Sequence, residues 1–175
     1  MLGTDVHPAR EALLAGLPVA ERRLEIAGAS TAVLEGGDGP PLVLLHGPGA
    51  NAAHWLRVIP DLVAGHRVIA PDLPGHGASG PTEDPVAWLA ALIEATCPAT
   101  PTVAGVAVGG ALAARAAIER GDVIGRLVLI DSLGLTAFEP APEFGAASSG
   151  PLAPGGAPVP APATASTMRA GEVTA

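Results

Sequence analysis

Four short apolar runs recur along the middle of the chain, and each is typical of a β-strand buried on both faces. The runs are LVLLH (42–46), HRVIAPD (66–72), TVAG (102–105) and RLVLID (126–131). Segments with helical character lie between them, at 52–62, 85–95 and 109–120, and Pro60 interrupts the first of these. Strands that alternate with helices require a parallel sheet with helices on both faces. We therefore predict an α/β fold for residues 40–132.

The residues before this region predict a helix and a hairpin. The helix falls within residues 7–16, with Pro8 near its start and Gly16 at its end. The segments RRLEIAG and STAVLEG then alternate in polarity and are joined through Gly28, as in an antiparallel hairpin. The complete prediction is a mostly parallel α/β sheet that begins with an antiparallel hairpin.

The alternating pattern ends near Gly134. The sequence EPAPEFGAASSGPLAPGGAPVPAPATAST follows, and its Pro, Ala, Gly and Ser residues cannot bury enough apolar surface to offset the entropy of ordering. We predict a folded, partial domain over residues 1–135 and a disordered low-complexity tail over residues 136–175. The sheet is then expected to stop after its sixth strand and to leave that strand at an uncovered edge.

The composition excludes several classes of partner. A formal net charge of −8 argues against nucleic acid and against an anionic membrane surface. A single cysteine, Cys97, excludes an internal disulfide and cysteine-rich metal sites. No apolar run approaches about 20 residues, and no basic segment precedes an apolar stretch at the N-terminus. We expect a cytoplasmic protein without a cofactor.

Three glycine-rich corners follow three successive predicted strands. They are HGPGAN (46–51), DLPGHGASG (72–80) and GVAVGG (105–110). In an open parallel sheet, ligands bind in the crevice beyond the carboxyl ends of the strands. The three corners together therefore form the candidate site.

These corners resemble those of the α/β-hydrolase superfamily, over about residues 22–135 and thus the N-terminal half of the family fold. LVLLHGPGA is similar to the strand and turn that begin the family's oxyanion loop, and VAGVAVGGALAARAA occupies the position of its nucleophile elbow. RVIAPDLPGHGASG resembles the family's D-x-x-G-H-G-x-S loop, and RLVLIDSLGL resembles the next strand. The matching loop residues, for which we expect a structural role, are Asp72, Gly75, His76, Gly77 and Ser79. The resemblance implies hydrolysis of esters or related acyl bonds.

The elbow departs from the family pattern at the residue that does the chemistry. The family elbow is G-x-S-x-G, with the nucleophile on a strained turn at the head of a helix. Here Gly105, Gly109 and the following Gly110 are present, but the central position is Ala107. A methyl group cannot attack a carbonyl or form an ester intermediate. The usual covalent route is therefore closed to this chain.

The other catalytic groups also depart from the pattern. In the family the nucleophile, the acid and the histidine follow one another in that order, but every histidine of this chain precedes Ala107. The histidines are His7, His46, His54, His66 and His76. Asp131 stands where some relatives place the acid, and without a histidine to orient we expect it to act as a capping or loop residue.

The predicted oxyanion hole retains about half of its donors. One donor is the backbone N–H of Val108, and the other belongs to the loop of His46, Gly47, Pro48 and Gly49. Pro48 has no N–H, so Gly49 has to substitute for it. Loss of one such donor typically lowers the rate by about 10²–10³.

Two other kinds of site receive little support from the sequence. His46, His76 and Asp72 do not have the spacing of a known metal site. The glycines at 105–110 and at 47–49 match neither the dinucleotide fingerprint nor the phosphate loop. We therefore predict no metal and no nucleotide.

Three functional hypotheses follow. The first is a member of the hydrolase family that is catalytically inactive as this chain, and the second is a non-catalytic binding module for a small apolar ligand. The third is an enzyme that takes a histidine and an acid from a partner chain, or uses water held by His46 or His76. We also expect self-association through the uncovered edge at 127–130, because an apolar edge strand invites pairing.

Overall fold

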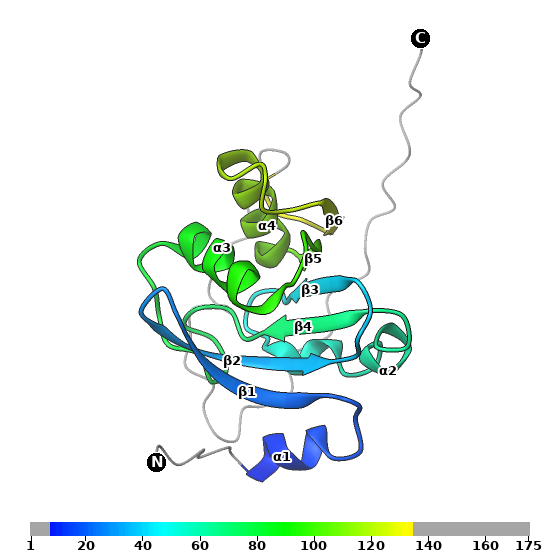
Figure 1. The fold of residues 1–175 in the computed structure, drawn as a ribbon. Helices are drawn as coiled ribbons and strands as arrows, with labels where there is room; N and C mark the ends of the chain where they lie inside the picture. The colour runs from blue at the N-terminus through cyan, green and yellow to red at the C-terminus, as the bar shows by residue number, and fades with distance from the viewer. Residues whose placement is uncertain (1–7, 135–175) are drawn as a thin grey trace, which may run out of the picture. The chain divides into compact units, whose positions relative to one another are not determined.

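The computed structural model describes residues 8–134, which form a six-stranded sheet with helices on both faces (Figure 1). The strands are β1 (Ala20–Ile26), β2 (Ala29–Gly36), β3 (Pro41–Leu45), β4 (Arg67–Pro71), β5 (Thr102–Val106) and β6 (Arg126–Ile130). The helices are α1 (Pro8–Leu14), the 3-10 helix η1 (Ala52–Trp55), α2 (Ile59–Leu62), α3 (Pro85–Thr96) and α4 (Val108–Glu119). The spatial order of the strands is β1-β2-β4-β3-β5-β6.

The pairing of the strands confirms the predicted fold class. β1 pairs with β2 and β2 pairs with β4 in antiparallel fashion, whereas β4, β3, β5 and β6 run parallel. Leu42 of β3 lies opposite Val68 of β4 and Thr102 of β5. The parallel strands therefore end at the same edge, and each of β3, β4 and β5 is followed there by a glycine-rich corner.

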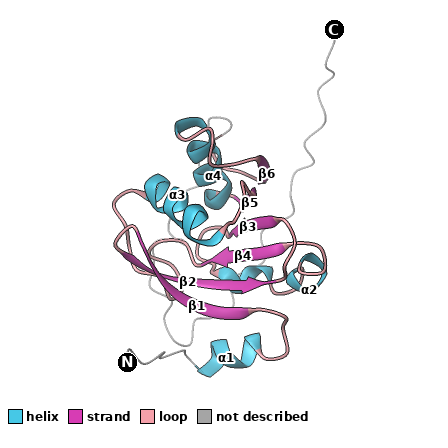
Figure 2. Ribbon diagram, viewed as in Figure 1, coloured by secondary structure: helices cyan, strands magenta, loops and turns pink. Residues whose placement is uncertain are grey.

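Two apolar layers hold the sheet between the helices (Figure 2). On one face, α3 and α4 pack against side chains such as Val43, Leu45 and Val103, and Trp88 of α3 is fully buried. Trp88 also donates its indole N–H to Oγ1 of Thr31 on β2 at 3.0 Å, which satisfies its polar atom. On the other face, η1 and α2 cover residues of β2, β3 and β4.

Pro60 does not interrupt a helix as expected, because it lies in the first turn of α2. The break in the helical segment comes earlier, between Trp55 at the end of η1 and Ile59 at the start of α2. Proline is tolerated in a first turn because its missing N–H has no partner within the helix there. The proline therefore helps to start α2.

The predicted tail, residues 136–175, lies outside the described residues. Within residues 8–134, β6 has no neighbouring strand on the side away from β5. In the same part of the chain, no helix has the length and the apolar character needed to cross a membrane.

Candidate functional site

The three glycine-rich corners come together at the carboxyl edge of the parallel strands. A Cβ placed on Gly47 would lie 3.9 Å from the Cβ of Ala107, so the corners after β3 and β5 are in contact. The rings of His46 and His76 meet edge to face with centroids 5.4 Å apart, which joins the corners after β3 and β4. The three corners that the sequence predicts to form the site therefore lie side by side.

Ala107 is the tip of the corner between β5 and α4. Its φ is 48° and its ψ is −110°, a backbone conformation that L-residues rarely adopt. The turn is held on both sides, because the Ala107 N–H donates to the carbonyl of Ile130 at 3.1 Å and the Ala107 carbonyl accepts from Leu133 at 3.2 Å. The turn therefore has the strained strand-to-helix geometry expected of a nucleophile elbow, and its tip carries a methyl group.

Glycine at 105 and 109 allows helix α4 to approach the sheet. A Cβ on Gly105 would lie 2.5 Å from backbone atoms of Gly109 and Gly110, and a Cβ on Gly109 would lie 2.6 Å from the carbonyl oxygens of Leu45 and His46. Real Cβ atoms do not come so close to backbone. The glycines therefore set the distance between α4 and the ends of β3 and β5.

The loop after β3 places Gly47 at the elbow but lacks the N–H that a residue other than proline would offer at position 48. Gly47 is buried beside Ala107, whereas Pro48 and Gly49 are exposed in a turn, with Gly49 at a φ of 67°. Pro48 has no N–H to offer. Val108, the first residue of α4, has an N–H in the first turn of the helix, where no carbonyl within the helix can accept it.

His46 is fully buried, and both of its ring nitrogens are engaged. Nε2 accepts the N–H of Leu73 at 2.9 Å, and Nδ1 donates to the carbonyl of Gly47 at 2.8 Å. These partners fix the neutral ring, and burial lowers the pKa of His46 from its ordinary value. The imidazole therefore links two loops and has no nitrogen left to take a proton from a substrate.

Asp72 organises the loop after β4. Its buried carboxylate accepts the N–H of Ala52 at 2.7 Å and that of Ala78 at 2.8 Å. Ser79 donates its hydroxyl to the Asp72 carbonyl at 2.8 Å and accepts the N–H of Ala32 at 3.0 Å. The Asp72 carboxylate and the Ser79 hydroxyl therefore satisfy backbone groups of η1, β2 and the loop itself.

The tight path of this loop depends on its glycines. Gly75 and Gly77 have φ values of 74° and 54°, and a Cβ on Gly77 would collide with the Asp72 carboxylate. His76 lies between them, with Nδ1 3.0 Å from the carbonyl of Pro74. The ring of His76 is therefore held by its own loop as well as by His46.

Arg10 is the residue of this network that the sequence did not reveal. It lies on α1, and its guanidinium forms an ion pair with Asp72 at 2.9 Å and a second ion pair with Glu21 at 3.0 Å. Its side chain is only 13% exposed. A buried carboxylate such as that of Asp72 is stabilised by a cation. A prediction that Asp72 is buried would therefore have been the one signal in the sequence for a basic partner elsewhere in the chain.

Asp131 directly follows β6. It is exposed and has a φ of 46°, and the preceding residue Ile130 accepts the N–H of Ala107. Asp131 therefore lies next to the residue that accepts a hydrogen bond from Ala107, and the chain bends sharply at this point. No histidine of the described segment 8–134 comes later in the sequence.

An apolar groove of about 350 Å³ lies beside the elbow. Its walls come from the loop after β4, from the start of α3 and from one side of α4. The lining residues are Leu73, Pro74, His76, Pro85, Val108, Ala111, Leu112 and Arg115. The groove therefore offers mainly hydrocarbon surface, with an imidazole and a guanidinium at its margin.

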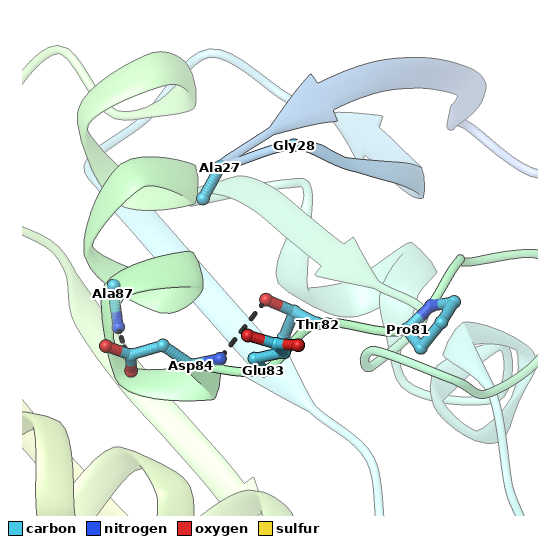
Figure 3. Close-up of a pocket in the computed structure, with 7 residues that line it drawn as sticks. All are labelled: Ala27, Gly28, Pro81, Thr82, Glu83, Asp84 and Ala87. Atoms are coloured by element: carbon cyan, nitrogen blue, oxygen red, sulfur yellow. Dashed lines mark hydrogen bonds between the residues drawn. The ribbon is translucent and has the colours of Figure 1, made fainter.

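A larger hollow of about 490 Å³ lies away from the corners, between the β1–β2 turn and the start of α3 (Figure 3). Two of its polar residues, Thr82 and Asp84, are engaged at the start of the helix. The Asp84 carboxylate accepts the N–H of Ala87 at 3.0 Å, and the Asp84 N–H donates to Thr82 Oγ1 at 3.4 Å. Over residues 8–134 no three His, Cys, Asp or Glu side chains form a group that could hold a metal ion. The corners at the carboxyl edge remain the candidate site.

Sequence comparisons give relatives that are esterases and hydrolases. An esterase of Mycobacterium tuberculosis is 38% identical over 121 residues, which are 65% of this chain and 40% of that protein. A pimeloyl-(acyl-carrier protein) methyl ester esterase of Aeromonas hydrophila is 37% identical over 106 residues, which are 59% of this chain and 42% of that protein. The chain therefore spans less than half the length of these relatives.

Solved structures share the same fold. The 2-hydroxy-6-oxo-6-phenylhexa-2,4-dienoate hydrolase of Rhodococcus sp. strain RHA1 superposes with a TM-score of 0.66 at 29% identity, over 73% of this chain and 51% of that one. A bacterial membrane phospholipase A superposes with a TM-score of 0.68 at 29% identity, over 76% of this chain and 46% of that one. The family described as alpha/beta hydrolase fold matches residues 40–153. With these corners and this sheet, the chain belongs to the α/β-hydrolase fold family.

Proposed function

We propose that this 175-residue chain is a non-catalytic member of its family. The observation that carries the proposal is Ala107, which has the backbone of the nucleophile elbow and only a methyl side chain. Covalent acyl transfer needs an oxygen, sulfur or carboxylate at that position. The sheet and the corners thus present an acyl-transfer site without the attacking atom.

The surrounding groups support the same conclusion. A serine nucleophile needs a histidine within hydrogen-bond reach, and all five histidines precede the elbow in the sequence. His46, the buried histidine of the site, uses both ring nitrogens to bind Leu73 and Gly47. Pro48 removes one N–H from the oxyanion loop. Each of these features would slow the reaction even if the nucleophile were present.

The test is to supply the missing oxygen. We expect the wild type and Ala107→Ser both to hydrolyse an aryl ester no faster than the buffer, because serine at the elbow still lacks a general base. Ala111→Ser, which places a hydroxyl one turn further along α4, is the matched control. Initial rates over a range of substrate concentrations provide the measurement. Saturable turnover by the wild type would overturn the proposal. Turnover by Ala107→Ser and not by the control would leave the missing nucleophile as the cause of inactivity and would overturn the claim that no base serves the elbow.

A second candidate function is the binding of a small apolar ligand. The observation that favours it is the groove beside Val108, which is lined by Leu73, Leu112 and two prolines. Burial of apolar surface in such a groove stabilises a complex without any catalytic group. Two relatives are pimeloyl-(acyl-carrier protein) methyl ester esterases, and one structural neighbour is a hydrolase of a phenyl-substituted dienoate, so acyl and aromatic compounds are the first ligands to examine.

Thermal unfolding distinguishes a protein that binds such a ligand from one that binds none. A ligand at a concentration tenfold above its Kd is expected to stabilise the native state by about 1.4 kcal/mol and to raise the Tm. Octanoate and phenylpropionate are suitable probes. Leu112→Lys, in the groove wall, is expected to abolish the shift, whereas Ile118→Lys, 85% exposed on the same helix, should retain it. An unchanged Tm across acyl and aromatic probes would contradict ligand binding.

A further inference from the structure

The two edges of the described sheet differ in their chemistry. β1, at one edge, carries Glu21, Arg22, Arg23 and Glu25, and charges of this kind deter a further strand from pairing. β6, at the other edge, has the sequence RLVLI, with one charge at its first position. The β6 edge therefore lacks the usual protection.

The side chains of β6 divide between a covered and an uncovered face. Leu127 packs against the core beneath α3 and α4. Val128 and Ile130 point to the opposite face and are 39% and 42% exposed. On that face they lie beside Ala104 and Val106 of β5, which pack against the second core layer. An apolar strip thus continues from the core out to the open edge.

The backbone hydrogen bonds show which groups of β6 face outward. The Arg126 N–H donates to the carbonyl of Pro101, and the Ile130 carbonyl accepts from Ala107, so these residues bond toward β5 and the elbow. Residues of a strand alternate in the direction of their backbone groups. The N–H and C=O groups of Leu127 and Leu129 therefore point away from β5, to the side on which a further strand would pair with β6.

We propose that the β6 edge binds β6 of a second copy of this chain, as an antiparallel pair with its two-fold axis at Val128. In an antiparallel pair, opposite residues share one face of the sheet. A two-fold axis at Val128 satisfies this rule, because it sets Leu127 opposite Leu129 of the partner subunit. Those residues carry the backbone groups that point away from β5, so both Leu127–Leu129 pairs can exchange hydrogen bonds.

The charges at the ends of β6 favour this antiparallel arrangement. Arg126 begins the strand and Asp131 follows its last residue. Antiparallel pairing brings each Arg126 to the end of the partner strand that carries Asp131, whereas a parallel pair would set like charges together. The sequence Leu127–Val128–Leu129 is symmetric about its centre, so the apolar contacts match as well.

The segment that follows β6 is a poorer occupant of the same edge. Proline recurs seven times between Pro140 and Pro162. A proline cannot donate to a strand ladder, and prolines at this density break any added strand after a few residues. A paired strand of five residues buries little area, so we expect a weak dimer whose population rises with protein concentration.

Disulfide trapping tests both the contact and its register. In a Cys97→Ser background, Val128→Cys is expected to give a covalent dimer on mild oxidation. The two Val128 residues form a non-hydrogen-bonded pair with Cα atoms about 4.5 Å apart, within the range for a disulfide of about 4.4–6.8 Å. Ile130→Cys is the matched control, because four residue steps separate it from its copy, or about 14 Å along the strand. Equal cross-linking of both variants would overturn the proposed register.

Sedimentation velocity over a range of concentrations tests the dimer without cross-linking. The wild type is expected to shift toward dimer as its concentration rises, and Val128→Lys should remain monomeric because it sets two ammonium groups face to face. Ile118→Lys adds the same charge on α4, away from the edge, and should dimerise like the wild type. A wild type that stays monomeric at all concentrations, together with no cross-link through residue 128, would refute the proposal and indicate that residues 135–175 or solvent cover the edge.

Discussion

Replacement of Asp72 by alanine is expected to lower the free energy of unfolding by about 3–5 kcal/mol. The substitution removes the fully buried one of the two carboxylates that pair with the Arg10 guanidinium, and leaves Glu21 as its partner. It also removes the acceptor for the N–H groups of Ala52 and Ala78. The loss of a buried ion pair and of the acceptor for buried donors is among the largest known costs of a single substitution. Urea unfolding followed by circular dichroism measures the change.

An exposed ion pair provides the control for this effect. Arg115 pairs with Glu119 one turn away on α4, and the two side chains are 67% and 43% exposed. Arg115→Ala should therefore leave the stability close to that of the wild type. Arg10→Met combined with Asp72→Asn removes both charges. The double variant should lower the free energy of unfolding by less than the sum of the two single changes. An Asp72→Ala variant as stable as Arg115→Ala would show that the buried pair does not hold α1 to the loops.

Gly105→Ala is expected to destabilise the protein by about 3 kcal/mol. The new methyl carbon would lie 2.5 Å from the backbone of Gly109 and Gly110. Backbone cannot rotate out of the way as a side chain can, so α4 has to move away from β5 and open the packing around Leu45. Equilibrium unfolding in urea gives the change in free energy, and near-ultraviolet circular dichroism reports the altered packing.

Gly65→Ala is the matched control for the added methyl group. Its Cβ would meet nothing within 4 Å, and its φ is not in the left-handed region. We expect Gly65→Ala to leave the stability within about 0.5 kcal/mol of the wild type. A Gly105→Ala variant equal to this control would mean that α4 can shift freely, and the elbow would then not be a rigid feature of the fold.

The sequence predicted the parts of the fold that are encoded locally. The apolar runs at 42–46 and 126–131 and the glycines that follow them specify strands and tight corners without reference to distant residues. The methyl group of Ala107 was equally visible, because the elbow is a contiguous motif. The prediction that Pro60 interrupts a helix was wrong. The sequence did not show where α2 begins, and only the start of the helix distinguishes a proline in the first turn from one in the interior.

Contacts between distant segments could not be predicted in this way. Arg10 and Asp72 are separated by 62 positions, and no local pattern marks one as the partner of the other. The hydrogen bond from Leu73 to His46 is a further case, because it depends on how two loops cross in space. The groove beside Val108 is built from three such segments, and its shape follows from their packing alone.

The backbone of Ala107 bears on how this corner can evolve. A non-glycine residue at a φ of 48° costs on the order of 1–3 kcal/mol, and glycine would avoid most of that cost. The corner has kept a Cβ, and alanine and serine codons differ by a single base at their first position. A hydroxyl at the elbow is therefore one mutation away, whereas His46, the buried histidine of the site, already uses both ring nitrogens. Under the proposed function, the activity of such a variant would be limited by the missing base and no longer by the missing nucleophile.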